Sequence, residues 1–139
     1  MKPIKILLIE DSEGDILLTV EALSDSKITN EIIVLKDGKE AIDFFETNPP
    51  PDKLPDLILL DINLPMKSGH EVLNYLKNSA TYRHIAVIML TTSSSEKDIL
   101  RAYDSYVNCY ITKPIDASDF MEAVTKIEDF WISIVTLPR

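Results

Sequence analysis

Cysteine and positive charge are scarce in this sequence, and no apolar run is long enough to cross a membrane. Cys109 is the only cysteine among 139 residues, so no intramolecular disulfide can form, which is compatible with a reducing compartment. Its apolar and aromatic neighbours indicate a small buried side chain. The N-terminal apolar run meets an acid at Glu10, too soon for a signal-peptide core or a membrane span. We therefore expect a soluble cytoplasmic protein.

The charge balance of the chain is strongly acidic. With 14 Lys and Arg residues against 23 Asp and Glu residues, the formal net charge is -9 at pH 7. Such a surface repels phosphate backbones and anionic lipids, so we expect neither nucleic acid nor a membrane as a direct partner. A divalent cation or a basic protein surface is a better match. The length and a hydrophobic content of 45% predict one domain, residues 1–139.

Five short apolar runs alternate with segments that have helical periodicity. The runs lie at Lys5 to Glu10, Asn30 to Leu35, Asp56 to Leu60, Ala86 to Leu90 and Cys109 to Thr112. Five helices are expected. The first runs from Ser12 to about Ser24, the second follows Asp37-Gly38, and the third, marked by Val72, Leu73 and Leu76, ends near Lys77-Asn78. The fourth runs from about Glu96 to Ser105, and the fifth follows Asp116. The proline-rich stretch from Thr47 to Pro55 predicts a loop. The alternation predicts a parallel sheet with right-handed crossovers and helices on both faces.

The last helical segment extends into an apolar tail, residues 128–139. Its expected apolar stripe consists of Phe120, Val124, Ile127, Trp131 and Ile134. Phe130 and Trp131 are adjacent, so both cannot point squarely into the same stripe. The tail either folds back on its own core or forms a homodimer interface, for which Phe130, Trp131 and Ile134 are the candidates. We favour the homodimer.

Polar residues stand at the carboxyl end of four of the apolar runs. They are Glu10 and Asp11, Asp61, Thr91 and Thr92, and Lys113. Parallel strands place these ends at one edge of the sheet, where the ligand crevice of such folds lies, so the side chains can meet in space. Converging carboxylates repel one another, and a hard divalent cation such as Mg²⁺ relieves the repulsion.

We expect Asp11 and Asp61 as direct Mg²⁺ ligands, Glu10 as a ligand through water, and the backbone oxygen of Asn63 as a further ligand. Lys113 adds an ammonium and Thr91 a hydroxyl, which suits a phosphoryl group. A carboxylate at the end of a buried strand can itself accept that group. Each residue alone has an ordinary explanation as a cap or turn residue. Their joint order predicts a metal-assisted phosphoryl site with Asp61 as the nucleophile.

With these residues the chain resembles the receiver domains of two-component response regulators over essentially its whole length. The matching motifs are Glu10-Asp11, Leu60-Asp61-Ile62-Asn63-Leu64-Pro65 with Gly69, Thr91, Tyr110 and Lys113-Pro114. The resemblance implies a flavodoxin-like sheet with strand order 2-1-3-4-5. It implies that Asp61 is phosphorylated by a sensor histidine kinase with Mg²⁺, and that Thr91 and Tyr110 form a conformational switch. It also implies a cis Lys113–Pro114 bond, and a chain that catalyses its own phosphorylation and dephosphorylation rather than acting as a conventional enzyme.

The tail narrows the resemblance. Residues 128–138, together with Asn108-Cys109-Tyr110, are similar to the single-domain regulators that partner bacterial phytochromes. This similarity implies a phytochrome-type kinase, no attached output domain, and an output through contact with an unidentified downstream protein. Two residues depart from the usual family pattern. Glu10 stands in place of Asp, which is expected to alter metal affinity, and Thr92 replaces a smaller residue, which is expected to narrow access to the phosphoryl site.

Three other functions use related features. An interaction module that keeps the fold without being phosphorylated would have lost the acceptor, a metal acid or the lysine, and all are present. A flavin-binding protein would need a phosphate cradle after the first strand, where Glu10-Asp11-Ser12 would repel the flavin phosphate. A Mg²⁺-dependent aspartyl phosphatase would be expected to have its nucleophile after the first strand. The phosphorylated receiver is the preferred prediction, and the unphosphorylated module is the alternative.

Overall fold

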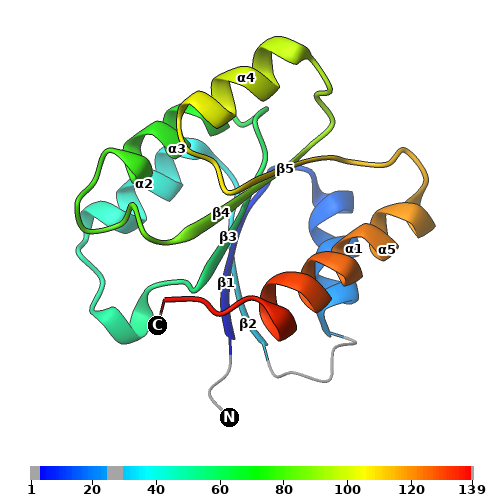
Figure 1. Cartoon of the computed structure of the whole chain (residues 1–139), viewed down its shortest axis with the longest axis horizontal. Coiled ribbons are helices and arrows are strands. Elements are labelled where there is room, and N and C mark those ends of the chain that lie inside the picture. The colour runs from blue at the N-terminus through cyan, green and yellow to red at the C-terminus, as the bar shows by residue number, and fades with distance from the viewer. Residues whose placement is uncertain (1–3, 25–29, 139) are drawn as a thin grey trace.

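Five parallel strands form one sheet in the computed structural model, which describes residues 4–24 and 30–138 (Figure 1). The strands are β1 (Ile4–Ile9), β2 (Asn30–Leu35), β3 (Leu57–Leu60), β4 (Ala86–Thr91) and β5 (Cys109–Thr112). They lie in the order β2-β1-β3-β4-β5, and every neighbouring pair is parallel. The predicted fold class and strand order are therefore confirmed.

Helices cover both faces of the sheet (Figure 1). One face carries α2 (Gly38–Glu46), α3 (Gly69–Lys77) and α4 (Glu96–Asp104), and the other carries α1 (Glu13–Ser24) and α5 (Ala117–Ile127). A single 3₁₀ turn, η1 (Pro51–Lys53), lies inside the predicted proline-rich loop. Across the part of the chain that the structure describes, no helix combines the length and apolar character that a bilayer crossing requires.

Side-chain caps fix where the helices begin. At α1 the Asp15 backbone N–H donates to Ser12 Oγ at 3.3 Å, and at α5 the Asp119 N–H donates to Asp116 Oδ1 at 3.1 Å, so both helices begin where the sequence predicts. At α4 the cap is Ser95. Each cap pairs a backbone donor that the first helical turn would otherwise leave unpaired. The caps therefore set each helix close behind the strand end that precedes it.

Alternate residues of the strands enter two separate cores. Leu7 and Ile9 of β1 pack toward α2, α3 and α4, whereas Ile6 and Leu8 pack toward α1 and α5. All four residues of β3, Leu57–Leu60, are fully buried. Burial on both faces explains why these strands read as continuous apolar runs rather than as alternating patterns.

The apolar stripe predicted for the last helix is confirmed at Phe120, Val124 and Ile127 and extends to Trp131, although the helix changes form after Ile127. After Ile127 the backbone changes to a π-helical segment, η2 (Glu128–Ile134), in which the Val135 N–H donates to the carbonyl of Phe130, five residues earlier, at 2.9 Å. The wider turn changes the residue spacing on which the stripe depends beyond Ile127. Trp131 packs partly against the core beneath α1 and α5, whereas Phe130 is 52% exposed. The Ile134 side chain lies outside the described residues.

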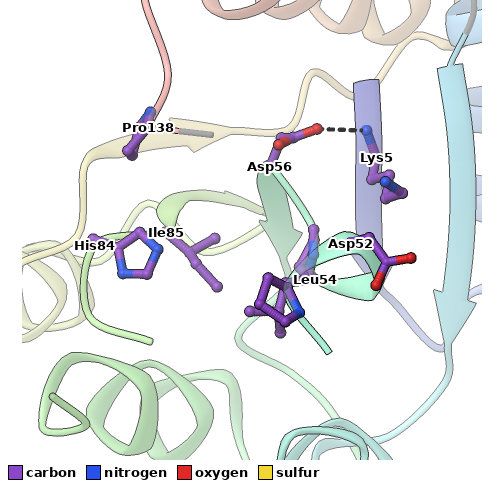
Figure 2. Close-up of a pocket in the computed structure, with 9 residues that line it drawn as sticks. Lys5, Asp52, Leu54, Asp56, His84, Ile85 and Pro138 are labelled. Carbon is purple, nitrogen blue, oxygen red and sulfur yellow. Dashed lines mark hydrogen bonds between the residues drawn. The ribbon is translucent and has the colours of Figure 1, made fainter. Parts of the chain in front are cut away.

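The chain returns to the amino edge of the sheet after η2. There Pro138 lies beside a hollow of about 150 Å³ that Lys5, Asp56 and His84 also line (Figure 2). The Lys5 backbone N–H donates to Asp56 Oδ2 at 2.9 Å, which joins β1 to the residue preceding β3. This edge is opposite the one at which the predicted functional residues lie.

Gly69 lies where any larger side chain would collide with the backbone of Asp61 and Ile62. A Cβ atom there would lie 2.0 Å from the carbonyl oxygen of Asp61, and the Gly69 N–H donates to the carbonyl of Ile62 at 2.8 Å. Because the backbone must shift to admit a methyl group, Gly69→Ala is expected to lower the free energy of unfolding by about 1–3 kcal/mol. Urea denaturation measures the change.

Gly14→Ala is the matched control for this substitution. Nothing lies within 4 Å of a Cβ atom at Gly14, and alanine is favoured over glycine in a helix by about 1 kcal/mol. The control variant should be as stable as the wild type or more stable. Equal losses in both variants would contradict the explanation by close approach.

Candidate functional site

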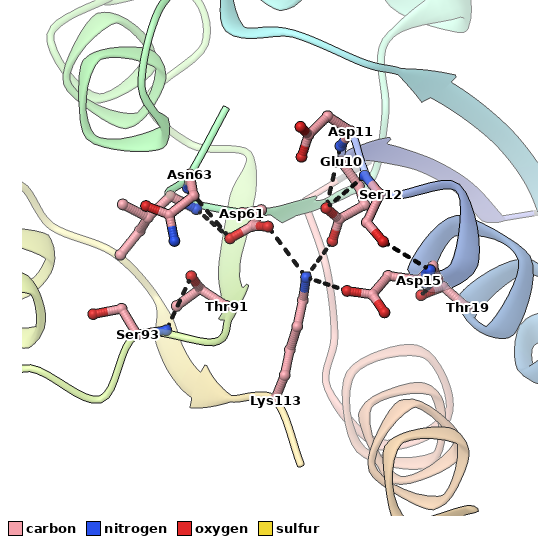
Figure 3. A network of polar contacts seen from close by, with 11 residues as sticks. Glu10, Asp11, Ser12, Asp15, Thr19, Asp61, Asn63, Thr91, Ser93 and Lys113 are labelled. Atoms are coloured by element: carbon pink, nitrogen blue, oxygen red, sulfur yellow. Dashed lines mark hydrogen bonds and ion pairs between the residues drawn. The ribbon is translucent and has the colours of Figure 1, made fainter. Parts of the chain in front are cut away.

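Side chains from three strand ends converge at the carboxyl edge of the sheet (Figure 3). Carboxylate oxygens of Glu10, Asp11 and Asp61 all lie within 4.8 Å of one another. Glu10 and Asp61 are buried, whereas Asp11 is exposed. The structure thus brings together the three acids that the sequence singled out.

Lys113 enters this cluster from the position directly after β5. Its ammonium donates to Asp15 Oδ2 at 2.9 Å, to Asp61 Oδ2 at 3.1 Å and to Glu10 Oε1 (Figure 3). Burial alone would lower the pKa of Lys113, but the hydrogen bonds to Asp15 and Glu10 and the charges of Asp61 and Glu10 outweigh it and raise the pKa above its ordinary value. The side chain therefore remains a cation in a buried site.

Glu10 shows how crowded the negative charge is. The pKa of Glu10 is raised to about 7, mainly by burial, with the hydrogen bond from Lys113 opposing the rise and the charge of Asp61 adding to it. Its Oε2 also accepts from the backbone N–H groups of Asp11 at 3.1 Å and Ser12 at 3.2 Å. One ammonium does not balance this set of carboxylates. The all-oxygen donor set and its excess negative charge fit a hard divalent cation such as Mg²⁺, as the sequence predicts.

Asp61 is oriented by the backbone that follows it. Its Oδ1 accepts from the N–H of Ile62 at 2.7 Å and from the N–H of Asn63 at 3.4 Å, and the residue is only 6% exposed. Its other oxygen, Oδ2, faces Lys113. Fixed N–H donors and an ammonium around one carboxylate suit a reaction in which negative charge develops on oxygen.

Asp15 is a member of the site that the sequence patterns did not identify. Its backbone N–H donates to Ser12 Oγ at the start of α1, and its carboxylate contacts Lys113. Buried Thr19, one turn later on α1, donates its hydroxyl to the Asp15 carbonyl at 2.7 Å. A signal existed in its position, because Asp15 lies in the first turn of α1, which begins just after the carboxyl end of β1.

The two residues predicted to form a switch contact the same loop. Thr91 is fully buried at the end of β4, and its Oγ1 lies 3.5 Å from the backbone N of Ser93, which donates to it. Half-buried Tyr110 donates its hydroxyl to the Ser93 carbonyl at 2.8 Å. Thr92, which lies between Thr91 and Ser93 in the chain, is exposed. Ser93 is therefore the residue through which both side chains meet.

The expected cis bond between Lys113 and Pro114 is absent. The described residues contain no cis peptide bond, so this bond is trans. The two isomers of a bond that precedes proline differ by only about 0.5–1 kcal/mol in intrinsic free energy, so the local sequence does not decide between them.

The family model for the response regulator receiver domain matches residues 6–125. The chain belongs to this family. This receiver domain is 44% identical to response regulator Rcp1 of Synechocystis sp., in an alignment that covers 98% of the chain and 94% of Rcp1. It is also 34% identical to the polar-differentiation response regulator DivK of Brucella anthropi, over 88% of the chain and 94% of DivK.

Solved structures agree with this assignment. The Mn²⁺-bound form of Rcp1 and the phosphorylated cyanobacterial phytochrome response regulator RcpA each superpose on the receiver domain with a TM-score of 0.93, at 44% identity, over 99% of the chain and 100% of theirs. The bacteriophytochrome response regulator AtBRR superposes with a TM-score of 0.72 at 38% identity, over 94% of the chain and 96% of its own. The similarity to phytochrome-associated regulators, predicted from the tail, is therefore confirmed.

Asp11 should contribute strongly to metal binding. Asp11→Asn removes one of three clustered carboxylates, so the affinity for Mg²⁺ is expected to fall by about tenfold or more. Isothermal titration calorimetry with Mg²⁺ measures the change. Asp52→Asn is the control, because Asp52 lines the hollow at the opposite edge of the sheet, and it should leave the affinity unchanged. Equal affinities of the Asp11→Asn variant and the wild type would rule out this role.

Proposed function

We propose that this receiver domain accepts a phosphoryl group on Asp61 from the phosphohistidine of a sensor histidine kinase. The observation that carries the proposal is the setting of Asp61, which ends a fully buried strand with one oxygen on backbone N–H groups and the other on Lys113. We infer that Glu10, Asp11, Asp61 and the backbone oxygen of Asn63 hold Mg²⁺. When bound, Mg²⁺ offsets the negative charges of the carboxylates and the transferred group.

The transfer is an exchange of one bond to phosphorus for another. A carboxylate oxygen of Asp61 forms a bond to phosphorus while the P–N bond of the donor breaks, and the departing imidazole takes up a proton. Lys113, already within hydrogen-bonding distance of Asp61, neutralises charge on the transferred group. Later attack by water releases inorganic phosphate and restores the carboxylate.

Thr91 and Tyr110 convert phosphorylation of Asp61 into a change of the protein surface. A phosphoryl group adds about -1.5 to -2 charge units and strong acceptor oxygens, which draw the Thr91 hydroxyl toward Asp61. The inward position of Tyr110 against the loop after β4, which its hydrogen bond to Ser93 already shows, is then favoured more strongly, and the surface near α4 and β5 changes with it. An unidentified downstream protein that contacts this surface receives the signal.

The kinase partner that we propose is a phytochrome-type histidine kinase in the cytoplasm. Support comes from the identity of 44% with Rcp1 over nearly the full length of both chains, and from the phytochrome-associated regulators among the similar structures. The acidic surface of the domain, with a net charge of -9, favours a basic docking surface on the kinase.

Phosphotransfer to Asp61 can be tested directly. With acetyl phosphate and Mg²⁺, the wild-type domain should gain one phosphoryl group that hydroxylamine removes, and Asp61→Asn should gain none, because an amide cannot form the acyl phosphate. Intact-protein mass spectrometry measures both. Asp52→Asn should be labelled like the wild type. Hydroxylamine-sensitive labelling that persists in Asp61→Asn would refute the site, and a wild-type domain that no donor labels would favour the unphosphorylated interaction module.

A second proposal concerns assembly. We propose that the domain forms a homodimer through the segment η2. An apolar groove of about 530 Å³ lies between β5 and η2, lined by residues that include Ile111, Ile127, Phe130 and Trp131. Trp131 already packs partly against the core of its own domain, so the exposed ring of Phe130 is the better anchor for a second copy of the chain.

Phe130→Ala should raise the dimer dissociation constant by at least about tenfold, because it removes a large exposed anchor. Leu17→Ala is the control, since Leu17 is 66% exposed on α1, away from the groove, and its dimer dissociation constant should stay at the wild-type value. Sedimentation equilibrium at micromolar concentration measures the constants. A monomeric wild type, with and without beryllofluoride as a phosphoryl mimic, would contradict the homodimer.

A further inference from the structure

A chain of hydrogen bonds joins α3, α4 and the loop of residues 92–95. Asp98, in the first turn of α4, is at its centre. Asp98 Oδ2 accepts from the hydroxyl of Ser93 at 2.6 Å, and Asp98 Oδ1 lies 3.0 Å from His70 Nε2 on α3. One carboxylate therefore bridges the loop to α3 through His70, which lies 28 residues before Asp98 in the chain.

His70 is the buried end of this chain of contacts. The residue is only 4% exposed, and burial of a polar ring costs free energy unless its nitrogens are hydrogen-bonded. Among the described residues, Nδ1 of His70 has no hydrogen-bond partner, so the contact of Nε2 with Asp98 is the anchor of the ring. Because an ionised carboxylate can only accept, Nε2 must carry the proton and donate it.

Asp98 is suited to hold both donors. Hydrogen bonds from Ser93 and then from His70 lower the pKa of Asp98, so the side chain remains a carboxylate. Hydrogen bonds to an ionised acceptor are stronger than those between neutral groups. The Asp98 backbone N–H also donates to the capping residue Ser95 at 3.0 Å. Asp98 is thus fixed at both its main chain and its side chain.

Ser93 connects this chain of contacts to the residues of the proposed switch. Its carbonyl accepts from the Tyr110 hydroxyl, its backbone N–H donates to Thr91 Oγ1, and its hydroxyl donates to Asp98. A displacement of Ser93 would therefore alter the positions available to both Thr91 and Tyr110. None of the hydrogen bonds that link His70, Asp98 and Ser93 reaches the acidic cluster of Glu10, Asp11 and Asp61.

We propose that His70 and Asp98 are positioning residues that hold Ser93 where its carbonyl captures Tyr110, and that this tether raises the affinity of the site at Asp61 for a phosphoryl group. The proposal rests on the proposed function of Asp61. Phosphorylation favours an inward Tyr110, and the tether favours the same arrangement. By thermodynamic linkage, two influences that stabilise one conformation strengthen each other.

The test is the binding of beryllofluoride in the presence of Mg²⁺, followed by ¹⁹F NMR. Ser93→Ala, Asp98→Asn and His70→Leu should each weaken this binding by about 3- to 10-fold, the effect of losing one charge-assisted hydrogen bond from the favoured conformation. Ser94→Ala is the matched control, since Ser94 is exposed in the same loop, and it should bind like the wild type. Ser93→Ala deletes only the hydroxyl of a half-buried loop residue, so it should fold even if His70→Leu does not.

A double-mutant cycle separates positioning from a general loss of stability. In a Tyr110→Phe background, Ser93→Ala should cause no further loss of beryllofluoride affinity, because the Ser93 carbonyl then has no tyrosine hydroxyl to capture. Variants that unfold at lower denaturant concentration but bind beryllofluoride as tightly as the wild type would overturn the tether alone. A wild-type domain that binds no beryllofluoride would overturn the proposed function and the tether with it.

Discussion

The ammonium of Lys113 is the contact on which the carboxyl edge of the sheet depends. Through Glu10, Asp15 and Asp61 it joins the end of β1, the first turn of α1 and the end of β3 to β5. Buried carboxylates repel one another and resist ionisation, so an edge built from several of them needs a cation at its centre. Because the lysine and the acids stabilise one another, the groups proposed to carry out phosphoryl transfer also hold four chain segments together.

The fold could be predicted because its physical requirements leave marks in the sequence. A strand that is buried on both faces, such as β3, must be apolar at every position, and a helix that begins close behind a strand needs a capping side chain such as Asp116. Other features leave weaker marks. Tyr82 lies between α3 and β4 with no periodic pattern, yet it is buried and donates its hydroxyl to the carbonyl of Phe45 at 2.8 Å. The change to a π-helix at Glu128 depends on which carbonyl each N–H selects, and apolar spacing does not record that selection.

Some residues of the candidate site could also be predicted from the sequence, and others could not. Glu10, Asp11, Asp61 and Lys113 stand at strand ends, and a parallel sheet brings strand ends together whatever the loops do. Asp15 was hidden because its position in a first helical turn has an ordinary capping explanation. The bridge from Ser93 through Asp98 to His70 was hidden for a different reason, since it depends on how closely α3 and α4 approach and on the side-chain orientations at that crossing.

The shortness of β3 has a consequence for how this domain tolerates change. Its four side chains alternate between the two cores, so the position of the strand is fixed by the packing of both cores. Insertion of one residue would exchange the two sets of side chains and turn Asp61 away from Lys113. A substitution that merely strains either core is transmitted along the same four residues to the carboxylate at their end. The packing of β3 and the position of Asp61 therefore depend on each other, so a defect in either core is expected to change the setting of this carboxylate as well as the stability of the fold.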